Sequence, residues 1–198
     1  MEKSYCVGIL LFDEVEVLDF AGPFEVFSIA SAPEQLNKPF LVQTVSQYGK
    51  MIKARNGLMV QPNFSFENAP DFDILIVPGG YGAEEIEINN GTVIQWIKNQ
   101  KNKVELIASV CTGAFLLAKA GLLNDKRATT HWMDIDRLER EFPNVNMERN
   151  CKFIDEGSII TSGGISAGIH MSFHILKRLL GEDVVKTTAR RMEYDITI

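Results

Sequence analysis

Apolar runs of strand type alternate with helical segments along most of the chain. Three of the runs, residues 5–12, 72–80 and 104–110, are mostly apolar and rich in Val, Ile and Leu, and the run 5–12 is continuously apolar. Such runs are typical of strands that are buried on both faces of a parallel sheet. Because helical segments separate them, the pattern predicts βαβ units and a mostly parallel α/β sheet covered by helices on both faces.

The other predicted elements fit this alternation. Gly22 and Pro23 favour a helix start, because proline is tolerated at the first helical position. Asn56-Gly57 and Glu156-Gly157 are turn signals that predict two hairpins. Strands are expected at 40–46, 127–132, 151–155 and 158–162, and helices at 22–31, 91–100, 113–121, 133–142 and 182–192. A long helix is predicted from an apolar stripe at Ile165, Ile169, Phe173, Leu176 and Leu180.

Length and charge exclude several classes of protein. The 198 residues predict a single domain, 1–198, that is long enough to bury a full core. The net charge of −6 argues against a nucleic-acid surface, and no apolar run reaches the roughly 18 residues of a membrane span. The N-terminus lacks the pattern of a secretory signal. Three widely spaced cysteines do not predict a disulfide framework, so we expect a cytoplasmic protein.

Residues with reactive side chains or free backbone groups follow three of the predicted strands. Asp19 lies beyond the first strand, Gly79 and Gly80 end the strand at 72–80, and Cys111 follows the strand at 104–110. In parallel sheets, chemistry gathers beyond the carboxyl ends of the strands. We therefore expect these three loops to converge on one site.

Cys111 stands between a predicted strand and a predicted helix. The free N–H groups of a helix N-terminus carry partial positive charge, so they favour a thiolate and lower the pKa of the thiol. A tight turn there would also raise the sulfur above the sheet, as in a nucleophile elbow. The alternative interpretation is a buried, inert cysteine. Cys6 and Cys151 are expected to be inert or structural.

The other loops offer partners for such a thiol. The backbone N–H groups of Gly79, Gly80 and Thr112 could form a site like an oxyanion hole, although a Gly pair also ends ordinary strands. Burial would raise the pKa of Asp19 and a helix dipole would lower it, and a carboxyl beside a thiol can hold its proton. Asp19 could equally be a simple helix-entry residue.

Three histidines remain. His131 could act as a general base to Cys111 or be a hydrogen-bonded structural residue. His170 and His174 have the spacing of a metal-binding pair on one helix face, but no Cys or carboxylate completes a ligand set, so no metal is predicted.

Several motifs together resemble the ThiJ/PfpI superfamily, whose fold is like that of the class I glutamine amidotransferases. They are LDFAGPFEVF, VPGG, VCTGAFLLAKAGLL, ATTHW and GGISAGIHMSFHIL, in this order along nearly the whole chain. The resemblance implies a flavodoxin-like three-layer sandwich with a nucleophilic cysteine on an elbow. It implies that Cys111 is the nucleophile, Asp19 its acidic partner, and Gly79, Gly80 and Thr112 the backbone donors.

Within the superfamily the sequence is most similar to isocyanide hydratases, and it also resembles the N-terminal domain of certain AraC-type regulators. The Asp at position 19 and the EYD at 193–195 fit the hydratases. Protease-like members have His where this chain has Thr112, and glyoxalase members usually have Glu at the acidic position. The resemblance thus implies hydration of isocyanides to N-substituted formamides without a cofactor. A redox or ligand sensor, and an amidase or glyoxalase activity, stay open as alternatives.

The expected partners are a small electrophilic substrate and a second copy of the chain. The homodimer is predicted partly from the resemblance and partly from the paired segment 50–66. Its apolar residues Leu58, Val60 and Phe64 need a covering surface. Neither nucleic acid nor a membrane is expected as a partner.

Overall fold

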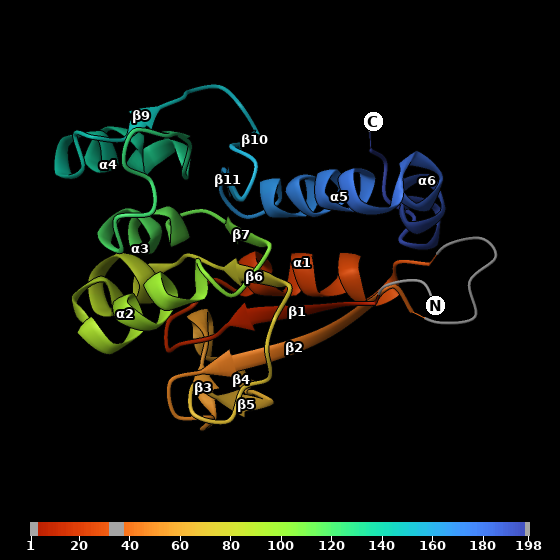
Figure 1. Cartoon of the computed structure of the whole chain (residues 1–198), viewed down its shortest axis with the longest axis horizontal. Helices are drawn as coiled ribbons and strands as arrows, with labels where there is room; N and C mark the ends of the chain where they lie inside the picture. The colour runs from red at the N-terminus through yellow and green to blue at the C-terminus, as the bar shows by residue number, and fades with distance from the viewer. Residues whose placement is uncertain (1–3, 32–37, 197–198) are drawn as a thin grey trace.

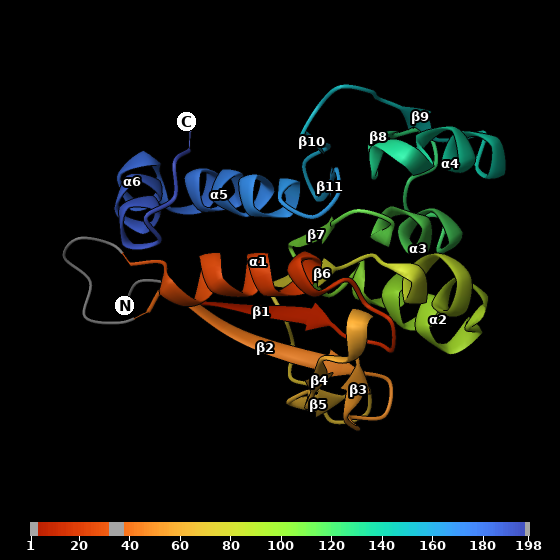
Figure 2. The ribbon, with the colours of Figure 1, turned by 180° about the vertical axis from the view of Figure 1, so that it is seen from behind.

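The central element of the structure is a seven-stranded sheet in the order β10-β11-β7-β6-β1-β2-β5. The computed structural model describes residues 4–31 and 38–196; the ends of the predicted domain 1–198 and residues 32–37 lie outside the described residues. Neighbouring strands are parallel except β10 and β11, which are antiparallel. Figures 1 and 2 show the sheet with helices around it, which confirms the predicted α/β class.

The predicted core strands are the middle of this sheet. β1 (Tyr5–Leu10) pairs on one side with β2 (Phe40–Ser46) and on the other with β6 (Ile74–Val77), which pairs with β7 (Leu106–Ser109). The strand that follows β1 in the sequence, β2, thus lies on one side of β1, and the later strands β6 and β7 lie on the other side. Ligands of open α/β sheets bind at the point where the strand order reverses, here beyond the carboxyl ends of β1 and β6.

Both predicted hairpins are confirmed. β3 (Ile52–Lys53) and β4 (Met59–Val60) pair antiparallel around a turn in which Asn56 and Gly57 have positive φ, joined by the 3-10 turn Arg55–Gly57. β10 (Phe153–Asp155) and β11 (Ile159–Ser162) pair around Gly157. β5 (Phe64–Ser65) is an edge of the main sheet.

The predicted strand 127–132 is shorter than expected. Only β8 (Arg127–Ala128) is strand, and it pairs with β9 (Asn146–Met147) in a small separate sheet. Thr129 and Thr130 are buried and irregular, and a 3-10 turn follows at Trp132–Asp134. The backbone here bonds a side chain of the central sheet instead of continuing a strand, since the Thr129 N–H donates to Thr161 Oγ1 of β11.

The helices form two groups that each pack together. One group is α1 with α5 and α6, and the other is α2 with α3, which contacts β6 and β7. No helix among the described residues is both long enough and apolar enough to cross a membrane. The bounds are α1 Val17–Ile29, α2 Gly91–Gln100, α3 Gly113–Lys119, α4 Ile135–Glu141, α5 Ala167–Leu180 and α6 Glu182–Arg191, with a π-helical turn at Gly82–Ile86 and a 3-10 turn at Glu87–Asn89.

The predicted start of the first helix is wrong. The helix α1 begins at Val17, five residues before Gly22, and Pro23 lies inside it. An interior proline removes one backbone hydrogen bond, but the buried side chains of Phe20, Val26 and Phe27 hold the helix against the core. The earlier start places Asp19 in the first turn of the helix and not ahead of it.

The predicted role of Ile165 as part of the apolar stripe of α5 is also wrong. Ile165 precedes α5, is 41% exposed and has φ of 55°. A β-branched residue with positive φ is a genuine outlier, and such strain clusters at functional sites.

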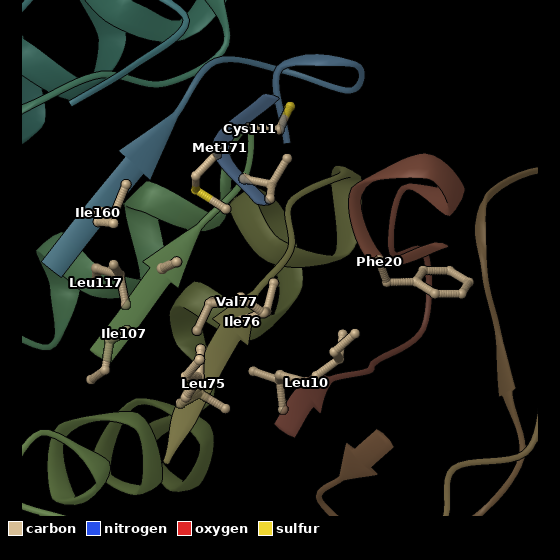
Figure 3. Close-up of a cluster of buried hydrophobic side chains, with 14 of the residues drawn as sticks. Leu10, Phe20, Leu75, Ile76, Val77, Ile107, Cys111, Leu117, Ile160 and Met171 are labelled. Atoms are coloured by element: carbon tan, nitrogen blue, oxygen red, sulfur yellow. The ribbon is translucent and has the colours of Figure 1, made fainter. Parts of the chain in front are cut away.

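The core fills the space between the sheet and its helices. Figure 3 shows Leu75, Ile76, Val77 and Ile107 of the central strands among fully or nearly fully buried side chains, with Cys111 at the top of the cluster. Burying such side chains removes apolar surface from water, and this stabilises the fold by about 25 cal/mol for each Å² buried. The rigid strands thereby fix the loops at their carboxyl ends.

Gly113→Ala should destabilise the fold by about 1–3 kcal/mol, the usual cost of overpacking. A Cβ at position 113 would collide with the carbonyl oxygens of Val77 and Pro78, which are backbone atoms and cannot turn away. Gly91→Ala is the matched control, because a Cβ there meets nothing within 4 Å. Urea denaturation of both variants tests this, and equal stabilities would contradict the predicted clash.

Candidate active site

Cys111 lies on a sharp turn between β7 and α3. Its φ is 55°, which is unusual for a residue other than glycine, and gives the predicted elbow. Two hydrogen bonds hold this backbone: the Cys111 N–H donates to the Gly163 carbonyl at 3.1 Å, and the Thr130 hydroxyl donates to the Cys111 carbonyl at 2.7 Å. The thiol is 7% exposed, so the elbow presents the sulfur at the edge of the core.

Asp19 reaches the same point from α1 and is fully buried. Its two carboxyl oxygens accept backbone hydrogen bonds, one from the Gly79 N–H at 3.0 Å and one from the Ile165 N–H at 3.1 Å. The Cys111 side chain lies beside this carboxyl and, as a hydrogen-bond partner, lowers the pKa of Asp19. The predicted convergence of the Asp19, Gly79 and Cys111 loops is therefore present, and the segment before α5 joins them.

Ile165 is also part of the site, although its sequence pattern predicts only a helix residue. Its contribution is a backbone N–H, and its positive φ turns that group toward Asp19. A backbone donor leaves little trace in the identity of its own residue. The nearby glycines of GGIS are the available signal, because Gly164 has no room for a side chain between His131 and Cys111.

Burial is the largest influence on the pKa values of Asp19 and Cys111, and it raises both. It raises the pKa of Asp19 to about 7, against the hydrogen bonds from Gly79 and Ile165, and the charge of Glu16 raises the pKa further. Burial also raises the pKa of the Cys111 thiol above its ordinary range, the charge of Asp19 adds to this, and the N–H and hydroxyl of Thr112 oppose it.

The prediction that the helix N-terminus lowers the pKa of the Cys111 thiol is therefore wrong. The helix α3 has seven residues, and desolvation together with the carboxyl outweighs its terminal N–H groups. The two acids resist carrying two negative charges, so they titrate as a pair that shares one proton. A thiolate arises when that proton resides on Asp19.

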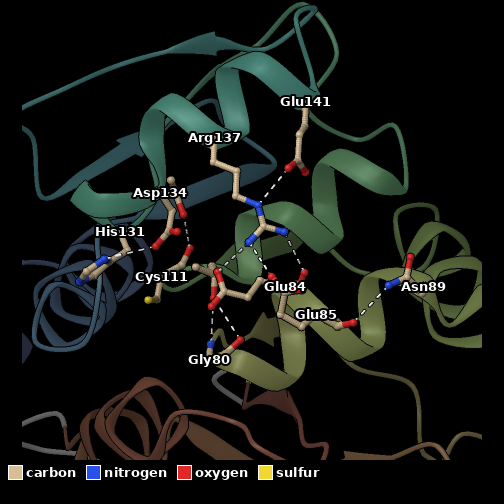
Figure 4. Close-up of polar contacts among 11 residues, drawn as sticks. Gly80, Glu84, Glu85, Asn89, Cys111, His131, Asp134, Arg137 and Glu141 are labelled. Atoms are coloured by element: carbon tan, nitrogen blue, oxygen red, sulfur yellow. Dashed lines mark hydrogen bonds and ion pairs between the residues drawn. The ribbon is translucent and has the colours of Figure 1, made fainter.

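Gly79 and Gly80 do not provide the free donors that were predicted. The Gly79 N–H donates to Asp19. The Gly80 N–H donates to the Thr112 hydroxyl at 2.9 Å, one of the dashed contacts at Gly80 in Figure 4. Gly79 instead allows close approach, because a Cβ there would collide with the Thr112 N–H at the start of α3. Among the three predicted backbone donors, the Thr112 N–H is the one that bonds the Cys111 sulfur.

A cavity of about 300 Å³ opens over the thiol. His131 lines it, and its Nδ1 lies 3.4 Å from Asp134 Oδ2 (Figure 4). His131 and Cys111 both abut Gly164, so the histidine belongs to the site, although it is not bonded to the thiol. The other lining residues are Glu16, Arg55, Gly80, Tyr81, Glu84, Thr112, Met133, Asp134 and Ile165.

An arginine not singled out from the sequence supports one wall of this cavity. Arg137 of α4 bonds the Glu84 backbone and carboxyl, Glu85 at 2.8 Å and Glu141 at 2.9 Å, and its guanidinium lies 5.0 Å from the Phe115 ring centroid (Figure 4). This joins the short helix α4 to the π-helical turn that carries Glu84.

The other two histidines have separate contacts. His174 bonds Asp155 at 2.7 Å, whereas His170 contacts Lys152 and Tyr194. Within residues 4–31 and 38–196, no three His, Cys, Asp or Glu residues are placed to hold a metal ion. Cys6 lies in β1, where burial and then Asp73 raise its thiol pKa.

We expect the alkylation rate of Cys111 by iodoacetamide to rise in two steps with pH. The first lies near pH 7, where Asp19 loses its proton and its carboxylate can accept the thiol proton as the sulfur attacks. The second lies above the ordinary thiol value of ~8.5. Asp19→Asn leaves one titrating group, so the lower step should vanish.

Mass spectrometry of the Cys111 peptide across pH measures both steps. Asp183→Asn, in the first turn of α6, is the control and should keep them. A single step near 8.5 in the unaltered protein would show that the two acids are not coupled.

The chain is similar in sequence to known proteins. The protein is 33% identical to isonitrile hydratase of Pseudomonas putida over 189 residues, which is 95% of this chain and 78% of the relative. It is 28% identical to the HTH-type transcriptional regulator GbdR of Pseudomonas aeruginosa, covering 96% of this chain but only half of the regulator.

Solved structures show the same fold at lower identity. A THiJ/PfpI family protein from Pseudomonas syringae has a TM-score of 0.86 at 22% identity and covers 98% of this chain and 77% of its own. Drosophila melanogaster DJ-1beta has a TM-score of 0.83 at 20% identity and covers 98% and 100%. The model of the DJ-1/PfpI family matches residues 6–178, and the chain belongs to this family.

Proposed function

We propose that the protein is a cysteine-dependent hydratase that converts isocyanides to N-substituted formamides. The observation that carries the proposal is the contact between Cys111 and a buried Asp19 whose pKa is raised to about 7. A carboxyl with this pKa can accept and return a proton at neutral pH, which is what a general acid–base group must do. The 33% identity to an isonitrile hydratase supports the choice of substrate.

In the first step the Cys111 sulfur attacks the terminal carbon of the isocyanide, R–N≡C. The thiol proton passes to Asp19 as the S–C bond forms, and Asp19 then delivers it to the same carbon. The product is the thioimidate R–N=CH–S–Cys111, with no atom gained or lost. The Thr112 N–H, which bonds the sulfur, stabilises the thiolate before attack.

In the second step water adds to the thioimidate carbon. Asp19 is a carboxylate after its delivery and can accept the proton of the water, while the nitrogen is protonated. The C–S bond then breaks, the sulfur recovers a proton, and the formamide R–NH–CHO leaves. His131 lines the same cavity beside Asp134 and is a second candidate for the base that activates this water. The cycle needs no cofactor.

The runner-up function is a sensor that uses the same thiol without turnover. The identity to the regulator GbdR favours it, although this chain spans half of that relative. Oxidation or ligand binding at Cys111 would be the input. An amidase or glyoxalase reaction is the other alternative for this thiol. Turnover of isocyanides, amides and 2-oxoaldehydes distinguishes these functions, with Cys111→Ser as the inactive reference.

Asp19→Asn should lower isocyanide hydration by about 10²–10⁴-fold, the usual contribution of a general acid–base group. Asparagine keeps the shape but cannot exchange a proton at neutral pH, and it can accept only one of the two N–H bonds from Gly79 and Ile165. Formamide release is followed by chromatography, and circular dichroism checks the fold.

Asp183→Asn is the matched control, with its carboxyl exposed on α6, and should keep full activity. Near-full activity of Asp19→Asn would remove Asp19 from the mechanism. An unaltered protein that is inactive on every isocyanide would overturn the hydratase proposal in favour of the sensor.

We also propose that two copies associate through the β3–β4 hairpin. Met51 is 57% exposed, Leu58 49% and Met59 54%, so this hairpin presents neighbouring apolar side chains to solvent. Val60 and Phe64, which were expected to need the same cover, are half-buried in the protein itself.

Light scattering should give about twice the 22.2 kDa mass of the chain, and Leu58→Asp should shift the mass toward one copy. Leu41→Asp changes an exposed residue of β2, and it is the control for a general effect of removing surface apolar area. A single-copy mass for the unaltered protein at micromolar concentration would exclude the dimer.

A further inference from the structure

A second cavity lies away from the thiol, between β10, α5, α6 and the segment that follows α6. Its volume is about 220 Å³, and it shares no lining residue with the cavity over Cys111. Figure 1 shows α5 and α6 beside the end of the chain, on the other side of β10 and β11 from α4. The mechanism above uses none of its residues.

Every ionisable residue that lines this cavity is basic. Lys152, His170, His174 and Lys177 line it, and no Asp or Glu does. The chain as a whole carries 26 acidic and 20 basic residues. A cavity with only basic groups in an acidic protein is a local reversal of charge, and it favours an anion.

Two of these groups are held together and lack a carboxylate. The Lys152 ammonium lies 3.1 Å from His170 Nε2 and 3.3 Å from Nδ1, so it sits over the ring. The Tyr194 hydroxyl bonds His170 Nε2 at 3.1 Å and orients the ring. Across the described ranges, Lys152 and His170 form no ion pair with a carboxylate; His174 differs, because Asp155 already pairs with it.

The electrostatics around His170 favour an anion. Burial lowers the pKa of His170, and the charge of Lys152 lowers it further. An anion between the two groups would relieve this repulsion and accept charge-assisted hydrogen bonds from both. Lys177, on the same wall, lies 3.9 Å from Glu182, a long contact, and adds to the positive field.

The remaining walls are apolar. Phe153, Phe173, Val185 and Ile196 line the cavity, and the Phe153 ring lies 4.5 Å from the imidazole of His174. Small-molecule sites combine such walls with a few placed polar groups. The walls would gain little from an inorganic anion but would bury an organic body.

We propose that this cavity binds a small organic carboxylate, with the carboxylate against Lys152 and His170 and the apolar body against Phe153 and Phe173. The site is distinct from the active site, but two backbone hydrogen bonds of Gly163 connect the two sites. The Gly163 N–H donates to the Lys152 carbonyl, and the Gly163 carbonyl accepts from the Cys111 N–H.

Titration with 4-fluorobenzoate, followed by ¹⁹F NMR, tests the proposal. We expect saturable binding that Lys152→Met and His170→Gln each weaken about tenfold or more, through the loss of a charge-assisted hydrogen bond. Lys186→Met on α6 removes the same charge from outside the cavity and should leave binding unchanged. Thermal melts check that each variant is folded.

Three further arms identify the ligand and its place. The neutral 4-fluorobenzamide should bind at least tenfold more weakly, inorganic phosphate should compete poorly, and 4-fluorobenzoate should not protect Cys111 from iodoacetamide. No binding of 4-fluorobenzoate at millimolar concentration would overturn the proposal. So would binding that is unchanged in both cavity variants, equal binding of the amide, displacement by phosphate alone, or protection of Cys111.

Discussion

The contact between the Cys111 thiol and the Asp19 carboxyl is the interaction around which the site is arranged. Neither group is strongly reactive alone in a buried setting, because burial raises the pKa of both. Together they hold one proton that can move between sulfur and oxygen. The Gly79 and Ile165 N–H groups keep the carboxyl in place, and the Thr112 N–H opposes the cost of charge on sulfur. The site is therefore a pair of acids that share one proton.

Keeping the pair in place requires unfavourable backbone at two points. Cys111 and Ile165 both have positive φ, and such residues typically cost about 1–3 kcal/mol each. Gly163 connects the two segments, because its carbonyl accepts the Cys111 N–H two residues before Ile165. The strands β7 and β11, which lead into these segments, are fully buried neighbours in the sheet. The core stabilises the strands, and the strands impose the strained loops at their ends.

The strands and the meeting of the three loops could be predicted because apolar periodicity and βαβ topology are local signals. The start of α1 could not, since the packing of Phe20, Val26 and Phe27 outweighs the helix-breaking effect of Pro23. The thiol pKa was predicted in the wrong direction because burial is a property of the whole fold, whereas a helix start is visible in the sequence. The sequence does not show that the Gly79 and Gly80 N–H groups are already hydrogen-bonded, and the reason is the same. Their partners lie 60 and 32 residues away.

The same proton pair suits an enzyme and a sensor, and what separates them is the fate of the covalent adduct. A hydratase must admit water to the thioimidate carbon, whereas a sensor must exclude it long enough for the adduct to change the fold. The cavity over Cys111 carries Glu16, His131 and Asp134 on its walls, which are groups that hold water. Met133 is 67% exposed at the same mouth, so the cavity is open to solvent as well as polar. A polar, open cavity shortens the life of a hydrolysable adduct, and this favours turnover over storage of a signal at this thiol.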